Sequence, residues 1–214
     1  MFLYKYKKRK GIIKKMNVPN KLTVLRICLV PIIVIISLIN IPGEFLGIPI
    51  EYWLMDILFI IASITDKLDG DLARKNNQIT NFGKFLDPIA DKILVVSAFI
   101  ILVGEQKLPT WVPIIVIFRE FVVSAYRLIT VQSNGKVIAA NKWGKIKTAS
   151  QMVAIIMAFI DKYPYGAIFT TQMSTFSFVW NLVVTVIMTF SVIATIFSGY
   201  EYLKGGKELI FKDM

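Results

Sequence analysis

Histidine is absent from this 214-residue sequence, and cysteine occurs only once, at Cys28. Without histidine the chain has no imidazole base, no imidazole metal ligand and no serine triad that depends on histidine. A single cysteine forms neither a disulfide within the chain nor a thiolate cluster for a metal ion. Any catalysis or metal binding therefore falls to carboxylates and cationic side chains.

Charged residues are also scarce, at 18% of the chain, whereas 56% of the residues are hydrophobic. This composition suits an integral membrane protein better than a soluble domain. Crossing a hydrocarbon core about 30 Å thick takes about 20 apolar residues. Six runs approach that length: 22–41, 50–65, 85–103, 111–131, 148–160 and 176–197. We therefore predict an all-α, polytopic membrane protein with six transmembrane helices.

Lysine and arginine are distributed unevenly between these runs. Eight precede residue 22, four lie between the second and third runs, four lie between the fourth and fifth, and three follow the sixth. The other connections hold one or none. Because positive residues favour the cytoplasmic side, we expect both termini and the even-numbered connections to be cytoplasmic. The bias toward lysine and isoleucine favours a bacterial source, and hence a multi-pass protein of the bacterial plasma membrane.

Four aspartates stand where the second run ends and the third begins: Asp66, Asp69, Asp87 and Asp91. Residues three or four apart lie on one face of a helix, so each pair presents its carboxylates together. Charges in a bilayer are costly, so four acids at one depth imply compensating cations. Oxygen ligands favour Mg²⁺ or Mn²⁺. Two such ions would clamp a diphosphate, and a carboxylate at the edge would take a proton from an attacking hydroxyl.

The residues between the aspartates have plain explanations when taken singly. Gly70 and Gly83 alone would be ordinary loop residues, and Arg74 alone would be a cytoplasmic positive residue. Together with Ala73, however, they keep a fixed spacing to the acids. The pattern Asp66-x2-Asp69-Gly70-x2-Ala73-Arg74-x8-Gly83-x3-Asp87-x3-Asp91 resembles the signature of the CDP-alcohol phosphatidyltransferase family at every position.

This resemblance implies a six-helix membrane enzyme, usually a homodimer, that moves a phosphatidyl group from CDP-diacylglycerol to an alcohol and releases CMP. It implies that Asp66 and Asp87 bridge two metal ions and that Asp69 completes one of them. Asp91 would bind the other ion and act as the general base. The partners implied are CDP-diacylglycerol, the alcohol and membrane lipids, with no nucleic acid.

The resemblance also suggests nucleotide contacts. Gly70, Arg74 and Thr80 resemble the family's CDP-binding positions. The stretch 19–26, Pro-Asn-Lys-Leu-Thr-Val-Leu-Arg, resembles its amino-terminal nucleotide-contacting segment and would place Asn20 and Thr23 near CDP. Taken alone, Asn20 and Thr23 are as well explained as caps of the first helix.

The acceptor is suggested by cations farther along the chain. The fourth run holds Arg119 and Arg127, and Lys142, Lys145 and Lys147 follow it, which is more positive charge than orientation requires. An anionic acceptor fits best, although Arg119 or Glu120 paired structurally between helices is an alternative. The stretches 119–127 and 144–148 resemble the phosphatidylglycerophosphate-forming branch of the family, whose acceptor is glycerol 3-phosphate.

Other interpretations stay open at this point. The same chemistry with inositol phosphate, serine or phosphatidylglycerol as acceptor is the main alternative, because the aspartate signature reports the donor. A cation transporter or an inactive scaffold is more remote. Residues 1–15 form a basic extension outside the resemblance, which we expect to be dispensable or a misassigned start, and 16–214 form the membrane domain. Asp56 is expected to be a solvated boundary residue.

Overall fold

The computed structural model describes residues 17–75, 81–132 and 142–205, and these form six α-helices with a short hairpin and a 3₁₀ turn. The helices are α1 (Val18–Leu38), α2 (Ile50–Lys75), α3 (Asn81–Gly104), α4 (Trp111–Gln132), α5 (Lys142–Phe159) and α6 (Thr175–Gly205). Each of the six apolar runs lies largely within one of these helices. The prediction of a mostly helical chain is therefore confirmed.

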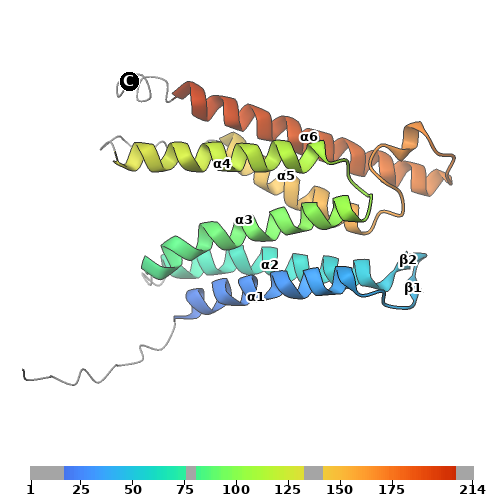
Figure 1. The fold of residues 1–214 in the computed structure, drawn as a ribbon, viewed down its shortest axis with the longest axis horizontal. Helices are drawn as coiled ribbons and strands as arrows, with labels where there is room; N and C mark the ends of the chain where they lie inside the picture. Colours follow the sequence, from blue (N-terminus) through green and yellow to red (C-terminus); the bar gives the residue numbers. More distant parts are fainter. Residues whose placement is uncertain (1–16, 76–80, 133–141, 206–214) are drawn as a thin grey trace, which may run out of the picture.

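The helices run antiparallel along one bundle, with α1 packed on α2 and α3, and α6 packed on α4 and α5 (Figure 1). Helices α1, α3 and α5 start at the end of the bundle where α2, α4 and α6 finish (Figure 1). We call this the acidic end, because it holds the aspartates of α2 and α3. The opposite end, where the hairpin and the 3₁₀ turn lie, is called the loop end.

Two helices in the described part of the chain are long and apolar enough to cross a membrane: Asn20–Leu38 in α1 and Thr175–Lys204 in α6. The other four carry more charged residues, including Asp87, Asp91 and Lys92 in α3 and Arg119, Glu120 and Arg127 in α4. Six spans and the orientation of the termini thus stay predictions. Many of the charges that interrupt the other four helices belong to the candidate site described below.

The distribution of side chains between inside and outside is that of a membrane protein. Large apolar residues point outward, as with Phe118 (70% exposed) in α4 and Phe176 (78% exposed) in α6. Polar groups are buried between helices, among them Gln151, whose amide donates to Thr195 Oγ1 at 3.0 Å. Exposed apolar surface of this extent is costly in water but not against lipid.

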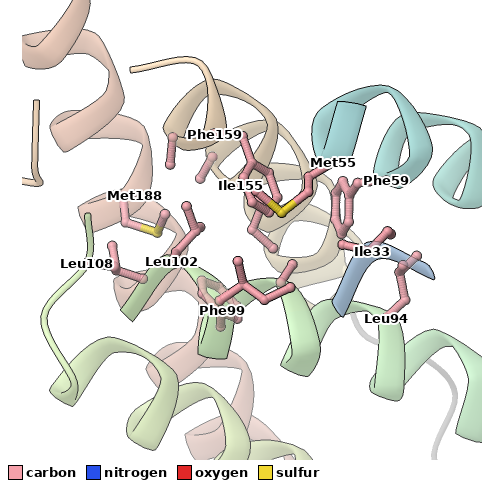
Figure 2. Close-up of a cluster of buried hydrophobic side chains, with 14 of the residues drawn as sticks. Ile33, Met55, Phe59, Leu94, Phe99, Leu102, Leu108, Ile155, Phe159 and Met188 are labelled. Atoms are coloured by element: carbon pink, nitrogen blue, oxygen red, sulfur yellow. The ribbon is translucent and has the colours of Figure 1, made fainter. Parts of the chain in front are cut away.

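All six helices contribute side chains to the apolar core, and α4 does so only near its start. Figure 2 shows Phe59, Phe99, Phe159 and Met188 among the side chains that meet between the helices. Each of these four is fully buried. Aromatic and branched side chains of α2, α3, α5 and α6 therefore fix the relative positions of the helices that carry the site.

A hairpin that was not predicted joins α1 to α2. Its antiparallel strands are β1 (Glu44–Phe45) and β2 (Ile48–Pro49). Its two turn residues, Leu46 and Gly47, both have positive φ, at 56° and 69°. Such a pair suits the two-residue turns that join short antiparallel strands. The hairpin thus closes the connection between α1 and α2 at the loop end.

A buried lysine holds the loop end together. Lys107 Nζ donates to the carbonyl oxygens of Phe159 at 2.7 Å and Asp161 at 2.8 Å, and it lies over the Tyr52 ring. These bonds satisfy carbonyl groups at the end of α5 that have no partner within the helix. Asn181 of α6 donates to Asp161 Oδ2 at 2.9 Å, so the segment between α5 and α6 is held from both sides.

Asp56 differs from expectation. It is 4% exposed and its Oδ1 is buried without a hydrogen-bond partner, so the expectation of a solvated boundary residue is wrong. The reason is tertiary: Asp56 faces the interior of the bundle, within electrostatic range of Lys107. No local pattern in the sequence indicates that these two residues approach each other.

Candidate active site at the acidic end

Three of the four signature aspartates lie in described parts of two neighbouring helices. Asp66 is near the end of α2, and Asp87 and Asp91 are in the first turns of α3. Asp91 lies within electrostatic range of Asp66, so carboxylates from both helices reach one region. The side chains of Asp69, Gly70 and Arg74 and all of Thr80 are outside what the structure describes, as is the side chain of Lys142.

Two side chains of α1 contact these acids. Thr23 Oγ1 donates to Asp87 Oδ1 at 2.7 Å, and the Arg26 guanidinium pairs with Asp66 Oδ1 at 2.6 Å. Thr23 and Arg26 are 1% and 0% exposed. Residues three apart share a helix face, so α1 presents both donors to the gap between α2 and α3.

The buried face of α1 explains why these donors point inward. Asn20, Thr23 and Arg26 follow one another at intervals of three, and Val30 and Ile33 continue the same buried stripe deeper in the bundle. The stripe is polar at the acidic end and apolar beyond it. Asn20 is therefore buried on the same face of α1 as Thr23, and its CDP contact stays a prediction.

A second cluster joins α4, α5 and α6. The Glu120 carboxylate forms ion pairs with Lys147 of α5 and, at 3.0 Å, with its neighbour Arg119. Arg119 also donates to the hydroxyl of Ser198 in α6. Gly199 allows this approach, because a Cβ there would come within 3.1 Å of Arg119 Cγ. The alternative of an Arg119–Glu120 pair thus exists structurally, and it includes Lys147.

The two clusters are adjacent. Lys147 is 6% exposed and lies within electrostatic range of Asp91 as well as bonding to Glu120. Lys92, which follows Asp91 in the sequence, donates to the hydroxyl of Ser124 in α4. A continuous polar region therefore extends from the aspartates of α2 and α3 to the cations of α4 and α5.

The other cations predicted to bind the acceptor differ in where they lie. Arg127 donates to the Tyr202 hydroxyl at 3.3 Å, and the guanidinium groups of Arg119 and Arg127 both lie near the Tyr202 ring, 5.6 and 5.8 Å from its centroid. Tyr202 thus links the two arginines. Lys145 is exposed on α5. The structure brings Arg119, Arg127 and Lys147 toward one region and leaves Lys145 at the surface.

The aspartates suit divalent cations by their chemistry. All the donors are carboxylate oxygens, as Mg²⁺ and Mn²⁺ prefer, and they come from two helices that face each other. Among the residues with described side chains, no three acids, histidines or cysteines gather closely enough to form a ligand set, and Asp69 lies outside that part. The donor types therefore fit such ions.

Sequence reasoning missed several contributors. Arg26 belongs to the stretch 19–26 but had no predicted role of its own, and Lys92 had none either. Ser198 and Tyr202 follow the sixth apolar run, which ends at residue 197. The one available signal was spacing: Arg26 follows Thr23 by three residues and Lys92 follows Asp91 by one. The α6 residues had no such signal, because their partners lie in α4.

Comparison with known proteins points to the same family as the aspartate signature. Residues 16–197 match the model of the CDP-alcohol phosphatidyltransferase family. A protein of Bacillus subtilis named CDP-diacylglycerol–glycerol-3-phosphate 3-phosphatidyltransferase is 42% identical over 91% of this chain and 97% of its own length. A protein of Haemophilus influenzae with the same name is 36% identical over 79% of this chain and 91% of its own length.

An Escherichia coli protein that also carries this name is 38% identical over 65% of the chain and 74% of its own length. The family match spans the aspartates of α2 and α3 as well as the cations of α4 and α5. Family members generally depend on divalent metal ions, in agreement with the donor types of the site. The chain therefore belongs to the CDP-alcohol phosphatidyltransferase family and is a phosphatidyltransferase.

Proposed function

We propose that this enzyme transfers the phosphatidyl group of CDP-diacylglycerol to glycerol 3-phosphate, which yields phosphatidylglycerophosphate and CMP. The observation that carries the proposal is the adjacency of the aspartates in α2 and α3 to the buried cations around Glu120. The names of the Bacillus subtilis and Haemophilus influenzae relatives support glycerol 3-phosphate as the acceptor. Inositol phosphate, serine and phosphatidylglycerol are the competing acceptors.

In this proposal Asp66, Asp69, Asp87 and Asp91 hold two divalent cations, Mg²⁺ or Mn²⁺. When bound, the cations offset the charge of the donor diphosphate and of the leaving phosphate. The CDP part of the donor is bound by residues at the acidic end, namely Asn20, Thr23, Gly70, Arg74 and Thr80. The acyl chains stay in the lipid beside the bundle.

Asp91 is the proposed general base. It takes the proton of the primary hydroxyl of glycerol 3-phosphate. The hydroxyl oxygen then forms a bond to the phosphorus attached to diacylglycerol, and the bond from that phosphorus to CMP breaks, with CMP keeping the electron pair. Positioning of the two substrates and a fixed electrostatic environment supply most of the acceleration.

The acceptor phosphate is bound by the cations of α4 and α5. Lys147 is the best-placed member, because it is buried and within electrostatic range of Asp91. A phosphate at Lys147 would leave the hydroxyl of the same small molecule near the base. The full proposed set is Arg119, Arg127, Lys142, Lys145 and Lys147.

For the whole protein we propose six spans, cytoplasmic termini and an acidic end at the cytoplasmic face of a bacterial plasma membrane. The grouping of positive residues near the acidic end supports this orientation. We also propose a homodimer, on the family resemblance alone. Residues 1–15 are proposed to be dispensable, which their deletion tests through the transferase activity of the shortened protein.

One assay tests the reaction. Purified protein in detergent is given CDP-diacylglycerol labelled in its acyl chains and each of the four acceptors in turn, with Mg²⁺ or Mn²⁺. With glycerol 3-phosphate we expect phosphatidylglycerophosphate that carries the label, together with unlabelled CMP. No product should form when a chelator is added. Product with another acceptor alone would move the enzyme to a sister reaction. No product with any acceptor would contradict the proposed function.

A further inference from the structure

Helix α1 contributes none of the four signature aspartates, yet it contacts one of them in each neighbouring helix. Thr23 donates to Asp87 of α3 at 2.7 Å, and Arg26 pairs with Asp66 of α2 at 2.6 Å. Both contacts use the Oδ1 atom of the carboxylate. The second oxygen of each carboxylate is used by neither of these two contacts.

The two donors are fully buried, whereas the Asp66 acceptor is partly exposed. Arg26 is 0% and Thr23 1% exposed, whereas the side chain of Asp66 is 35% exposed. The apolar part of the same stripe, including Leu29 and Ile33, packs into the core and anchors α1 against α2 and α3. The donors therefore fix the direction of the carboxylates from the inside of the bundle.

We propose that Thr23 and Arg26 are positioning residues that orient the Asp87 and Asp66 carboxylates for divalent cations. The inference rests on the proposed function, since it assumes that these aspartates hold metal. Partners that orient metal-ligating side chains typically account for a 10- to 100-fold effect on metal affinity or activity. Arg26 also places a positive charge beside the acids inside the bundle, where an unpaired carboxylate is costly.

This role goes beyond the CDP contact proposed above for Thr23, which would use the hydroxyl oxygen as an acceptor. The two roles have different consequences. The Thr23 hydroxyl has one hydrogen, and the bond to Asp87 uses it. A nucleotide contact predicts a higher KM for CDP-diacylglycerol in a Thr23 variant and unchanged metal binding. Positioning predicts weaker metal binding with no substrate present.

In the first test, purified protein in detergent is titrated with Mn²⁺ in the absence of substrate. Electron paramagnetic resonance measures the free and bound Mn²⁺ at each step. Thr23→Val keeps the shape of the side chain and removes the donor. We expect its Mn²⁺ affinity to fall about 10-fold. Thr23→Ser keeps the hydroxyl and should restore most of the affinity. Thr189→Val, which removes a hydroxyl that contacts Tyr165 instead, is the matched control and should bind Mn²⁺ as the wild type does.

The second test changes Arg26 to lysine. Lysine keeps the positive charge beside Asp66 when it is protonated, so this change tests the geometry of the donors, and Arg26→Met is the variant that removes the charge. The compact ammonium group cannot reproduce the planar fork of donors around Asp66. We expect about 10-fold weaker Mn²⁺ binding and a matching rise in the Mg²⁺ concentration that half-activates the enzyme. Near-ultraviolet circular dichroism of each variant checks that the fold is kept.

The outcomes separate this inference from the proposed function. If wild-type protein binds no Mn²⁺, the proposed metal chemistry fails. If wild-type protein binds Mn²⁺, and both Thr23→Val and Arg26→Lys bind it with the wild-type affinity, the metal chemistry stands and the positioning role is wrong. A Thr23→Val enzyme with normal Mn²⁺ affinity and a higher KM for CDP-diacylglycerol would assign Thr23 to the nucleotide.

Discussion

Glu120 supplies the negative charge that the buried cations of α4 and α5 share. Its carboxylate bonds to Lys147 and Arg119, and Lys92 lies within electrostatic range. Lys147 is 6% exposed, so it has little water to replace that partner. At the scale of the residue, the cationic site thus depends on an acid that the reaction itself does not use.

We expect Glu120→Gln to destabilise the protein by about 3–5 kcal/mol, because it removes one partner from a buried ion pair. Thermal unfolding in detergent measures this loss. Added glycerol 3-phosphate should raise the melting temperature of the variant more than that of the wild type, since the ligand phosphate would replace the missing negative charge. Glu44→Gln, at an exposed position in β1, is the matched control. An unchanged melting temperature in Glu120→Gln would show that the ion pairs contribute little.

Asp91 is the proposed general base, so its replacement should affect turnover directly. Asp91→Asn keeps the side-chain shape and removes both the proton acceptor and the charge. Turnover should fall by at least about 10²–10⁴-fold, the usual contribution of a general base, while binding of CDP-diacylglycerol remains measurable. Asp56→Asn is the control, because Asp56 lies on α2 about 15 Å along the helix from Asp66. Retained turnover in Asp91→Asn would rule out the assigned role.

At the scale of the element, Lys107 connects the α3–α4 loop to the end of α5. Its burial lowers the pKa of the Lys107 ammonium to about 8, although the nearby carboxylates of Asp161 and Glu105 act in the opposite direction. In the unfolded chain the pKa returns to about 10.5. Between these values the unfolded state binds more protons than the folded state, so stability rises with pH.

We therefore predict a difference in pH dependence between wild type and Lys107→Gln. Below pH 8 the stability difference between them should be constant. From pH 8 to about 10.5 the wild type should gain up to about 3 kcal/mol relative to the variant, the equivalent of its pKa shift. Melting temperatures across this range measure the gain. Lys162→Gln, at an exposed position of the same end, controls for the loss of a charge. A constant difference throughout would contradict the prediction.

At the scale of the whole molecule, the acidic end and the loop end should lie on opposite sides of the membrane. Cys28 is the only cysteine of the chain, so Cys28→Ser gives a background free of thiols. Single cysteines are then introduced at Lys145, near the acidic end, and at Lys162, at the loop end; both positions are exposed.

We expect a membrane-impermeant maleimide added to intact cells to label Lys162→Cys and not Lys145→Cys. Inside-out vesicles should give the reverse, because the positive residues favour a cytoplasmic acidic end. Labelling of both positions from one side would contradict the six-span topology. Labelling in the opposite sense would keep the spans and invert the orientation.

The aspartate register and the helical fold could be predicted because both depend on local properties of the chain. Apolar runs of near-membrane length predicted all six helices, and spacings of three and four placed Asp66, Asp87 and Asp91 on helix faces near one end. The hairpin at Leu46 and Gly47 was missed, since its strands have only two residues each. A pattern so short has no detectable period.

The sequence by itself determined the helices, the acids with their order, and the family to which they point. Only the tertiary structure decided which cation and which hydroxyl meet each acid. Thr23 and Asp87 are 64 residues apart in the chain, and Glu120 and Lys147 are 27 apart. No local rule links residues at such separations. Their contacts depend on how α1 packs against α3 and on how α4 and α5 come together, and that packing follows from side chains buried throughout the bundle.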